Sequence, residues 1–249
     1  MNFFKLLKRN LIYKFKKKID IDNDNFKEKN NLEKLFSFYK TDKANIIKNT
    51  NQKGHGYSDF YQKHFSEIKN KNINILEIGS YSGASAAAFS KYFDNVNIYC
   101  LDVNLTNFKY KSKKIHPFGI DANNLSLVNN FFKKIKFFET IKKFDIIIDD
   151  GSHLLSDQLK SLNFFLQHVK NNGFYVIEEY KFSEYFKHLK DTDQQNIRNV
   201  IESIKNGKIV KNDFLTKTAL DILNTNRSNI FEYKGQTPYS DILFVKIVN

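Results

Sequence analysis

The most informative stretch of the sequence is Phe144-Asp145-Ile146-Ile147-Ile148-Asp149-Asp150-Gly151-Ser152-His153. Its first half is an apolar run of strand length, and its second half brings two carboxylates, a turn glycine and a histidine to one point. A second apolar run, residues 173–177, is followed by another acidic pair, Glu178 and Glu179. If the two runs are neighbouring parallel strands, about 4.8 Å apart, these groups lie within reach of one another. Three carboxylates beside a histidine suit a hard divalent cation next to a general base, which indicates an enzyme.

Strands and helices alternate around this stretch, which predicts an α/β fold with a mostly parallel sheet and helices on both faces. The expected strands are residues 74–78, 97–102, 115–120, 144–149 and 173–178. The expected helices between them are residues 84–92, 125–134 and 155–169. Two runs of alternating apolar residues, 228–233 and 241–248, predict an antiparallel hairpin at the edge of the sheet.

The chain divides into three segments by composition. Residues 1–31 are expected to form a basic amphipathic helix and a polar linker. Residues 32–71 read as two short helices joined by a polar loop, which we interpret as a lid segment. Residues 72–249 form the main α/β domain, with a helical insertion around 181–213 whose clearest helix is expected at 192–204.

Composition narrows the class of protein further. The single cysteine, Cys100, excludes an intramolecular disulfide and lies in an apolar run, so we expect a buried, inert thiol and a reducing cytoplasm. The net charge of +13 would suit nucleic acid, but the lysines are spread widely along the chain, and specific nucleic-acid binding is not expected. No apolar run reaches the ~18–20 residues of a membrane span, and no signal-peptide core is found.

Residues 1–18 stand apart because they are basic and amphipathic. Phe4, Leu7, Leu11 and Phe15 recur at helical spacing among seven lysine and arginine residues. Two interpretations are open: a helix that lies on an anionic membrane surface, or an ordinary helix packed on the protein or on a second subunit.

A glycine-containing loop follows the first predicted strand, where open α/β sheets bind nucleotides. Its pattern is Glu77-x-Gly79-x-x-x-Gly83, and glycine lets a backbone turn tightly and approach a ligand closely. The spacing differs from the G-x-G-x-x-G pattern of dinucleotide enzymes. Asp102 ends the next predicted strand, a position suited to the hydroxyls of a ribose.

As a set, residues 72–180 resemble the class I S-adenosylmethionine (SAM)-dependent methyltransferases, which have a Rossmann-like sheet. The resemblance implies that Asp102 binds the ribose of SAM. Asp121, at the end of the third strand, would contact adenine, although a turn or helix cap is an equal alternative. The resemblance assigns the remaining cofactor contacts to the glycine loop, with Glu77, Gly79, Ser80, Tyr81 and Gly83.

A closer resemblance is to metal-dependent sugar O-methyltransferases of the mycinamicin type. It is carried by residues 149–153, by residues 177–179, and by the upstream motifs Thr41-Asp42-Lys43 and Gly54-His55-Gly56-Tyr57. The resemblance implies that Mg²⁺ or Mn²⁺ is held by Asp150, Glu178 and Glu179, that His153 is the catalytic base beside Asp150, and that the loop with His55 and Tyr57 covers the cofactor. The family commonly has Glu-Asp where this chain has Glu178-Glu179, so the sequence departs from the family there.

The expected activity is therefore methylation of a sugar hydroxyl, on a nucleotide-linked sugar or a bacterial surface glycan. The basic character of the chain suggests an acceptor that carries phosphate. Relatives of this type assemble as multimers, so a homo-oligomer is expected. Two alternatives remain: an RNA or DNA methyltransferase, suggested by the net charge, and a non-catalytic scaffold tethered to a membrane by residues 1–18.

Overall fold

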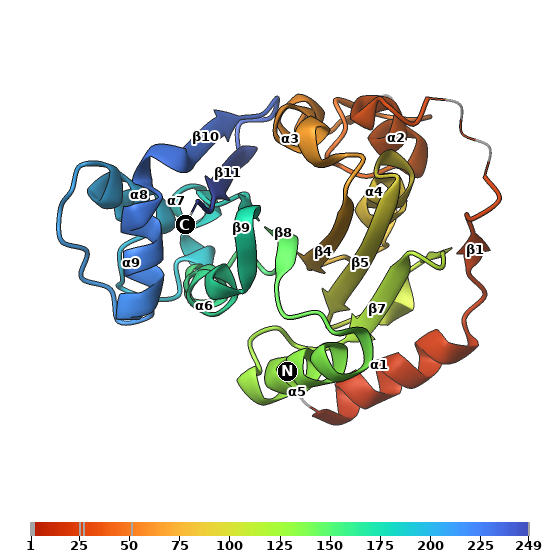
Figure 1. The fold of residues 1–249 in the computed structure, drawn as a ribbon, viewed down its shortest axis with the longest axis horizontal. Helices are drawn as coiled ribbons and strands as arrows, with labels where there is room; N and C mark the ends of the chain where they lie inside the picture. Colours follow the sequence, from red (N-terminus) through yellow and green to blue (C-terminus); the bar gives the residue numbers. More distant parts are fainter. Residues whose placement is uncertain (1–2, 25, 27, 51, 249) are drawn as a thin grey trace. The chain divides into compact units, whose positions relative to one another are not determined.

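The computed structural model describes residues 3–24, 26, 28–50 and 52–248. The chain forms two compact units (Figure 1). Unit 1 comprises residues 1–124 and 235–240, and unit 2 comprises residues 125–234 and 241–249. None of the helices in the described part of the chain is long and apolar enough to cross a membrane.

The sheet of unit 1 is parallel, as predicted. Its strands are β4 (Asn72–Ile78), β5 (Asn95–Asp102) and β7 (Ile115–Gly119), in the order β4-β5-β7. The apolar residues of β4 and β5 are buried along almost their whole length, which is typical of parallel strands covered on both faces. All three strands therefore end at the same edge, where the glycine loop and Asp102 follow.

Aromatic side chains pack the helices of unit 1 together. The helices are α2 (Leu32–Tyr39), α3 (Ser58–Phe65) with the 3₁₀ turn η1 (Ser66–Ile68), and α4 (Ala84–Tyr92). The Phe89 ring lies 5.4 Å from that of Phe36 and 5.5 Å from that of Tyr61, both nearly edge to face. Such pairs contribute about 0.5–1.5 kcal/mol beyond area burial, so they hold the predicted lid segment firmly on α4.

The segment that the sequence placed in a linker contains a short strand. β1 (Ile19–Asp20) pairs in parallel with β6 (Tyr110–Lys111), and Ile21 beside it is buried. Local polarity could not reveal this pairing, because the partner strand lies about ninety residues further along the chain. The remaining elements of unit 1 are α1 (Phe3–Phe15), the hairpin of β2 (Ile46–Ile47) and β3 (Gln52–Lys53), and η2 (Leu105–Asn107).

The sheet of unit 2 is mixed, with the predicted antiparallel hairpin at one edge. β8 (Phe144–Asp149) lies parallel to β9 (Val169–Glu178). β11 (Asp241–Lys246) runs antiparallel to β9, and β10 (Ile230–Lys234) runs antiparallel to β11. The fold class expected from the sequence, an α/β fold with parallel strands and a C-terminal antiparallel hairpin, is confirmed.

The helices of unit 2 differ from expectation mainly at their ends. They are α5 (Leu125–Glu139), α6 (Leu155–Phe165), α7 (Phe182–Tyr185), α8 (Ile197–Lys205) and α9 (Lys217–Thr225), with 3₁₀ turns η3 (Leu166–His168), η4 (Lys187–Leu189) and η5 (Arg227–Asn229). The helix expected from residue 192 begins at 197, because Asn196 caps it by accepting the backbone N–H of Asn199. Helix α9 was not predicted; Thr216 caps it in the same way.

Candidate active site

The loop after β4 turns through three residues in the left-handed region: Gly79 (φ +84°), Tyr81 (φ +42°) and Gly83 (φ +71°). The backbone N–H of Gly79 donates to Leu101 O at 2.8 Å, which ties the loop to the neighbouring strand. Ser80 is buried, whereas Tyr81 is 66% exposed. The loop is thus a fixed turn that presents Tyr81 outward.

Asp102 joins this loop to the end of β5. Its Oδ2 accepts the backbone N–H of Tyr81 at 2.7 Å, and its Oδ1 accepts that of Asn104 at 2.5 Å. A carboxylate offers about four lone-pair positions, so Asp102 keeps acceptor capacity for the two hydroxyls of a ribose. The position fits the predicted role.

Asp121, after β7, organises a turn. Its Oδ1 accepts the backbone N–H of Asn123 at 3.1 Å, and its carbonyl accepts that of Asn124. The structural alternative weighed for this residue is therefore realised, and a contact to adenine stays a prediction.

Two residues of the glycine motif have structural tasks that the sequence did not reveal. Glu77 is buried and accepts a hydrogen bond from the Ser85 hydroxyl, which fixes the start of α4. A Cβ at Gly83 would lie 2.5 Å from Cζ of Phe108, so that ring requires a glycine there. Cys100 is fully buried, as expected, and burial together with the nearby Glu77 carboxylate raises the pKa of its thiol.

The loop with His55 and Tyr57 is held by contacts within unit 1. His55 Nδ1 lies 2.6 Å from Ser240 Oγ, and its Nε2 lies 3.8 Å from Asp42 Oδ2. The imidazole stacks on the ring of Tyr57, which is fully buried. These contacts give both residues a structural role, and the predicted contact with a cofactor is not tested by them.

The second group of predicted site residues lies in unit 2, after β8 and β9. Asp150, His153 and Glu179 each offer a ligand atom within 4.8 Å of the others. His153 Nε2 lies 3.7 Å from Asp150 Oδ1, and both side chains are 21% exposed. The structure thus brings together two carboxylates and an imidazole at the place where the sequence predicted a metal site and a base.

Two residues of this cluster have a strained backbone. His153 (φ +57°) and Glu179 (φ +48°) are non-glycine residues in the left-handed region, which costs about 1–3 kcal/mol each. The ring of Phe182 packs edge-on against His153, and Gln158 Nε2 donates to the carbonyl of Glu179 at 3.4 Å. Sequence reasoning missed Gln158 and Phe182, because only the fold places them beside the cluster.

Glu178 and Asp149 are the acids next to this cluster in the sequence. Glu178 ends β9, is buried, and is not part of this cluster among the described residues. Burial raises the pKa of Asp149 to about 7, and its Oδ2 accepts the hydroxyl of Tyr175 at 3.5 Å. Asp149 does not cap the following helix, whose N-cap is Leu154. It belongs to the core behind the cluster.

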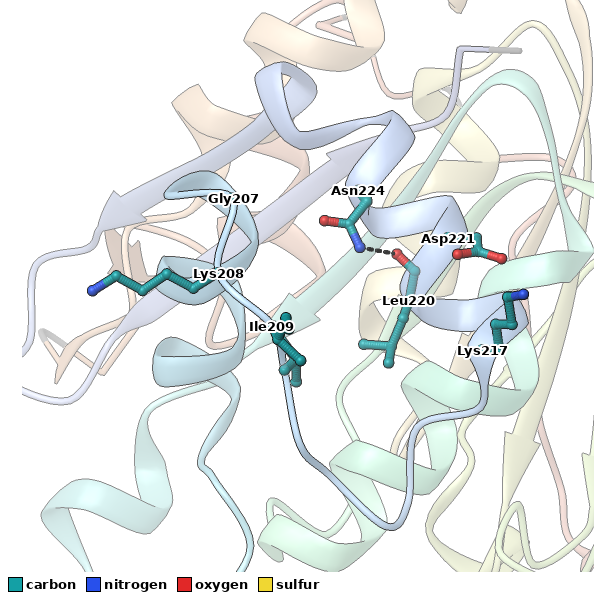
Figure 2. A pocket seen from close by; sticks show the side chains of 8 residues that line it. Gly207, Lys208, Ile209, Lys217, Leu220, Asp221 and Asn224 are labelled. Carbon is teal, nitrogen blue, oxygen red and sulfur yellow. Dashed lines mark hydrogen bonds between the residues drawn. The ribbon is translucent and has the colours of Figure 1, made fainter.

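A hollow of about 420 Å³ also lies in unit 2, between the 207–210 loop and α9 (Figure 2). Ile209, on its rim, is 88% exposed. None of the predicted site residues lines it, so we do not assign it to the site.

Residues 76–180 match a family model described as a methyltransferase domain. The matched segment contains the glycine loop, Asp102 and the cluster of Asp150, His153 and Glu179. The resemblance to methyltransferases stated from the sequence is confirmed over this segment.

Two relatives and one solved structure illustrate the similarity. Mycinamicin VI 2''-O-methyltransferase of Micromonospora griseorubida is 27% identical over 158 residues, covering 61% of this chain and 36% of that protein. Ribosomal RNA small subunit methyltransferase G of Malacoplasma penetrans is 24% identical over 198 residues, covering 68% of this chain and 79% of that protein. The solved structure of the MycE methyltransferase from the mycinamycin biosynthetic pathway, in complex with Mg and SAH, has a TM-score of 0.63 at 22% identity, covering 88% of this chain and 55% of that chain. The chain spans about a third of the length of the curated sugar methyltransferases that it matches.

Proposed function

We propose that this chain is a SAM-dependent, divalent-metal-dependent O-methyltransferase that acts on a sugar hydroxyl. The observation that carries the proposal is the clustering of Asp150, His153 and Glu179 in a methyltransferase domain. Methylation of a nucleic-acid base has no evident use for such a cluster, whereas activation of a weakly acidic hydroxyl needs both a Lewis acid and a base. The relatives that methylate antibiotic sugars support this choice.

The donor set fits a hard divalent cation. Asp150 and Glu179 would supply carboxylate oxygens, which suit Mg²⁺ or Mn²⁺, and Glu178 stays a predicted third ligand. When bound, the cation supplies Lewis-acid polarisation of the acceptor hydroxyl. The turn of Gly79 and the spare acceptor capacity of Asp102 suit the methionine and ribose parts of SAM.

His153 is the group that would remove the hydroxyl proton. The imidazolium that forms is stabilised by the Asp150 carboxylate, whose Oδ1 lies 3.7 Å from Nε2. The acceptor oxygen attacks the methyl carbon as the carbon–sulfur bond breaks, which releases S-adenosylhomocysteine and the methyl ether. Orientation of the reacting atoms supplies much of the acceleration.

The acceptor is proposed to be a nucleotide-linked sugar or a bacterial surface glycan that carries phosphate. The support is the net charge of +13, which attracts anionic substrates. A nucleotide-linked acceptor would place the reaction in the cytoplasm. Turnover should then fall as salt is raised, and an acceptor without phosphate whose turnover ignores salt would overturn this part.

The test is S-adenosylhomocysteine formation with nucleotide sugars, bacterial glycan and RNA as separate acceptors, with Mg²⁺ or Mn²⁺ and then with EDTA. We expect turnover on a sugar that EDTA abolishes and metal restores. Asp150→Asn should lower kcat/KM by about a hundredfold. Asp145→Asn is the matched control, because the Asp145 side chain has the same 21% exposure and lies in β8, the strand that leads to Asp150, and it should retain activity.

His153 is tested separately, because its nitrogen is close enough to be a ligand instead of a base. As a base, His153→Gln should lower kcat by about 10²–10⁴-fold and leave the midpoint of metal activation unchanged. A shift of that midpoint with kcat restored by excess metal would assign His153 to the metal.

An RNA methyltransferase is the second candidate. The specific support is the net charge and the ribosomal RNA methyltransferase relative, which matches over most of its length. It requires turnover on RNA that EDTA leaves intact. SAM binding without turnover on any acceptor would favour the non-catalytic scaffold. Assembly into a homo-oligomer stays a prediction, which sedimentation velocity would test.

A further inference from the structure

Helix α1 is fixed to unit 1 by one face. Leu6 on that face is buried, and Asn10 Nδ2 donates to the carbonyl of Gly119 at 3.0 Å. Tyr13 packs edge-on against Phe108, with ring centroids 6.2 Å apart. Figure 1 shows α1 beside the end of β7. The helix is therefore held at the edge of the sheet where the strands end.

The opposite face carries a row of exposed apolar side chains. Phe4 (77% exposed), Leu7 (55%), Leu11 (56%) and Phe15 (84%) form what we call the outer stripe. Their spacing of three, four and four residues aligns them along one side of a helix. Single exposed apolar residues are ordinary, but a continuous row of four is characteristic of an interaction surface.

Basic side chains flank the outer stripe. Lys5, Lys8, Lys14 and Lys17 are all exposed, and residues 1–18 contain no Asp or Glu. Two other cations of residues 1–18 bond to the body of unit 1: Arg9 Nη1 donates to Val103 O and Lys16 Nζ donates to Thr106 O. The outward face thus combines apolar side chains with exposed lysines, and residues 1–18 hold no acidic residue to pair with them.

We propose that the outer stripe docks α1 on an anionic lipid bilayer. A helix with an apolar face and a lysine rim lies at the boundary between headgroups and acyl chains, where lipid phosphates compensate the lysines. A second copy of this chain fits less well. It would bring another net +13 and a second set of lysines to the same contact.

Docking in this way would place one part of unit 1 at the bilayer. Side chains of α1 bond to the backbone carbonyls of Val103 and Gly119. Val103 directly follows β5, and Gly119 is the last residue of β7. The carboxyl ends of those strands, including Asp102, would lie next to the lipid surface. Such a location suits an acceptor carried on a lipid, but bilayer binding itself does not rest on the proposed activity.

The test is co-sedimentation of the full chain with vesicles of phosphatidylcholine alone or mixed with phosphatidylglycerol. We expect about tenfold stronger binding to the anionic vesicles at about 0.1 M salt, and a loss at higher salt as the Debye length shortens. The double change Leu7→Gln and Leu11→Gln should weaken binding about tenfold or more. Phe137→Gln with Phe138→Gln is the matched control, because these residues of α5 are 81% and 71% exposed.

Three results would overturn the proposal: no preference for anionic vesicles, unchanged binding of the Leu7→Gln/Leu11→Gln chain, or an equal loss in the Phe137→Gln/Phe138→Gln control. Sedimentation velocity separates the alternative occupant. A dimer that the α1 changes dissociate, without vesicle binding by the unaltered chain, would assign the outer stripe to a second copy. SAM binding by each variant shows that unit 1 remains folded. Because no turnover is measured, failure here is distinguishable from failure of the proposed activity.

Discussion

Gly83→Ala should strongly destabilise unit 1, for two reasons that add. The residue has φ +71°, and placing an L residue in the left-handed region costs about 1–2 kcal/mol. The new Cβ would lie 2.5 Å from Cζ of Phe108, whose ring is fully buried, and overpacking of this kind costs about 1–3 kcal/mol. The expected loss is about 2–5 kcal/mol, a large part of the ~5–15 kcal/mol by which proteins are stable.

The assay is urea unfolding of the full chain without cofactor, followed by circular dichroism. Gly207→Ala is the control, because Gly207 also has a positive φ (+65°) but the nearest atom to its Cβ would be Arg227 Nη1 at 3.6 Å, an ordinary contact, so only the conformational cost of about 1–2 kcal/mol is expected. Phe108→Leu added to Gly83→Ala should remove the steric part. The two changes together should then cost less than the sum of their separate losses.

The reasoning would be refuted by a Gly83→Ala chain within about 0.5 kcal/mol of the unaltered protein, because that figure is the scatter of neutral substitutions. Strict additivity of Gly83→Ala and Phe108→Leu would refute the steric part alone. It would leave the conformation of the loop as the sole source of the cost.

Three further predictions concern buried groups. Burial lowers the pKa of His168 to about 4. Between about pH 6.5 and 4 the unfolded chain therefore binds more protons than the folded chain. The free energy of unfolding should fall by about 2 kcal/mol as the pH drops through that range. His168→Gln should flatten this slope in urea titrations at each pH. Asp241 is buried and accepts from Tyr185 and Lys234, so Asp241→Asn should cost about 2 kcal/mol in thermal or urea unfolding, and a neutral result would contradict the pairing. Cys100 should react with a thiol reagent only after unfolding, and rapid labelling of the native chain would show that it is accessible.

The part of the site that could be predicted is the part that depends on local spacing. Asp150 and His153 are three residues apart in one turn, and they meet as expected. The resemblance assigned both acids of the second pair, Glu178 and Glu179, to the metal, although adjacent side chains at a strand end point in different directions. Among the described residues Glu179, whose backbone is left-handed, lies in the cluster, and Glu178 stays a predicted ligand.

The ends of the strands show the same limit of prediction from the sequence. β8 covers the predicted residues 144–149, because its apolar run is bounded by polar residues on both sides. β9 begins at Val169 instead of Gly173, because Val169 pairs with Phe144 on the neighbouring strand. A bulge separates this pair from the rest of the ladder, and the sequence of residues 169–172 had suggested a helix end and a polar loop. Pairing of this kind depends on the neighbouring strand, which local periodicity does not include.

Helix α1 shows most clearly which features could be predicted from the sequence and which depend on the tertiary structure. Four features could be predicted because they depend on relations between neighbours in the chain: the order of strands and helices, the glycine loop, the acidic strand ends and the amphipathic nature of residues 1–18. Which face of α1 meets the protein was decided only in three dimensions. The apolar row would ordinarily be buried, yet Leu6, Asn10 and Tyr13 pack inward, because Asn10 reaches a carbonyl of Gly119 more than one hundred residues away. A helix pattern defines two faces, and the partners that choose between them are distant in sequence.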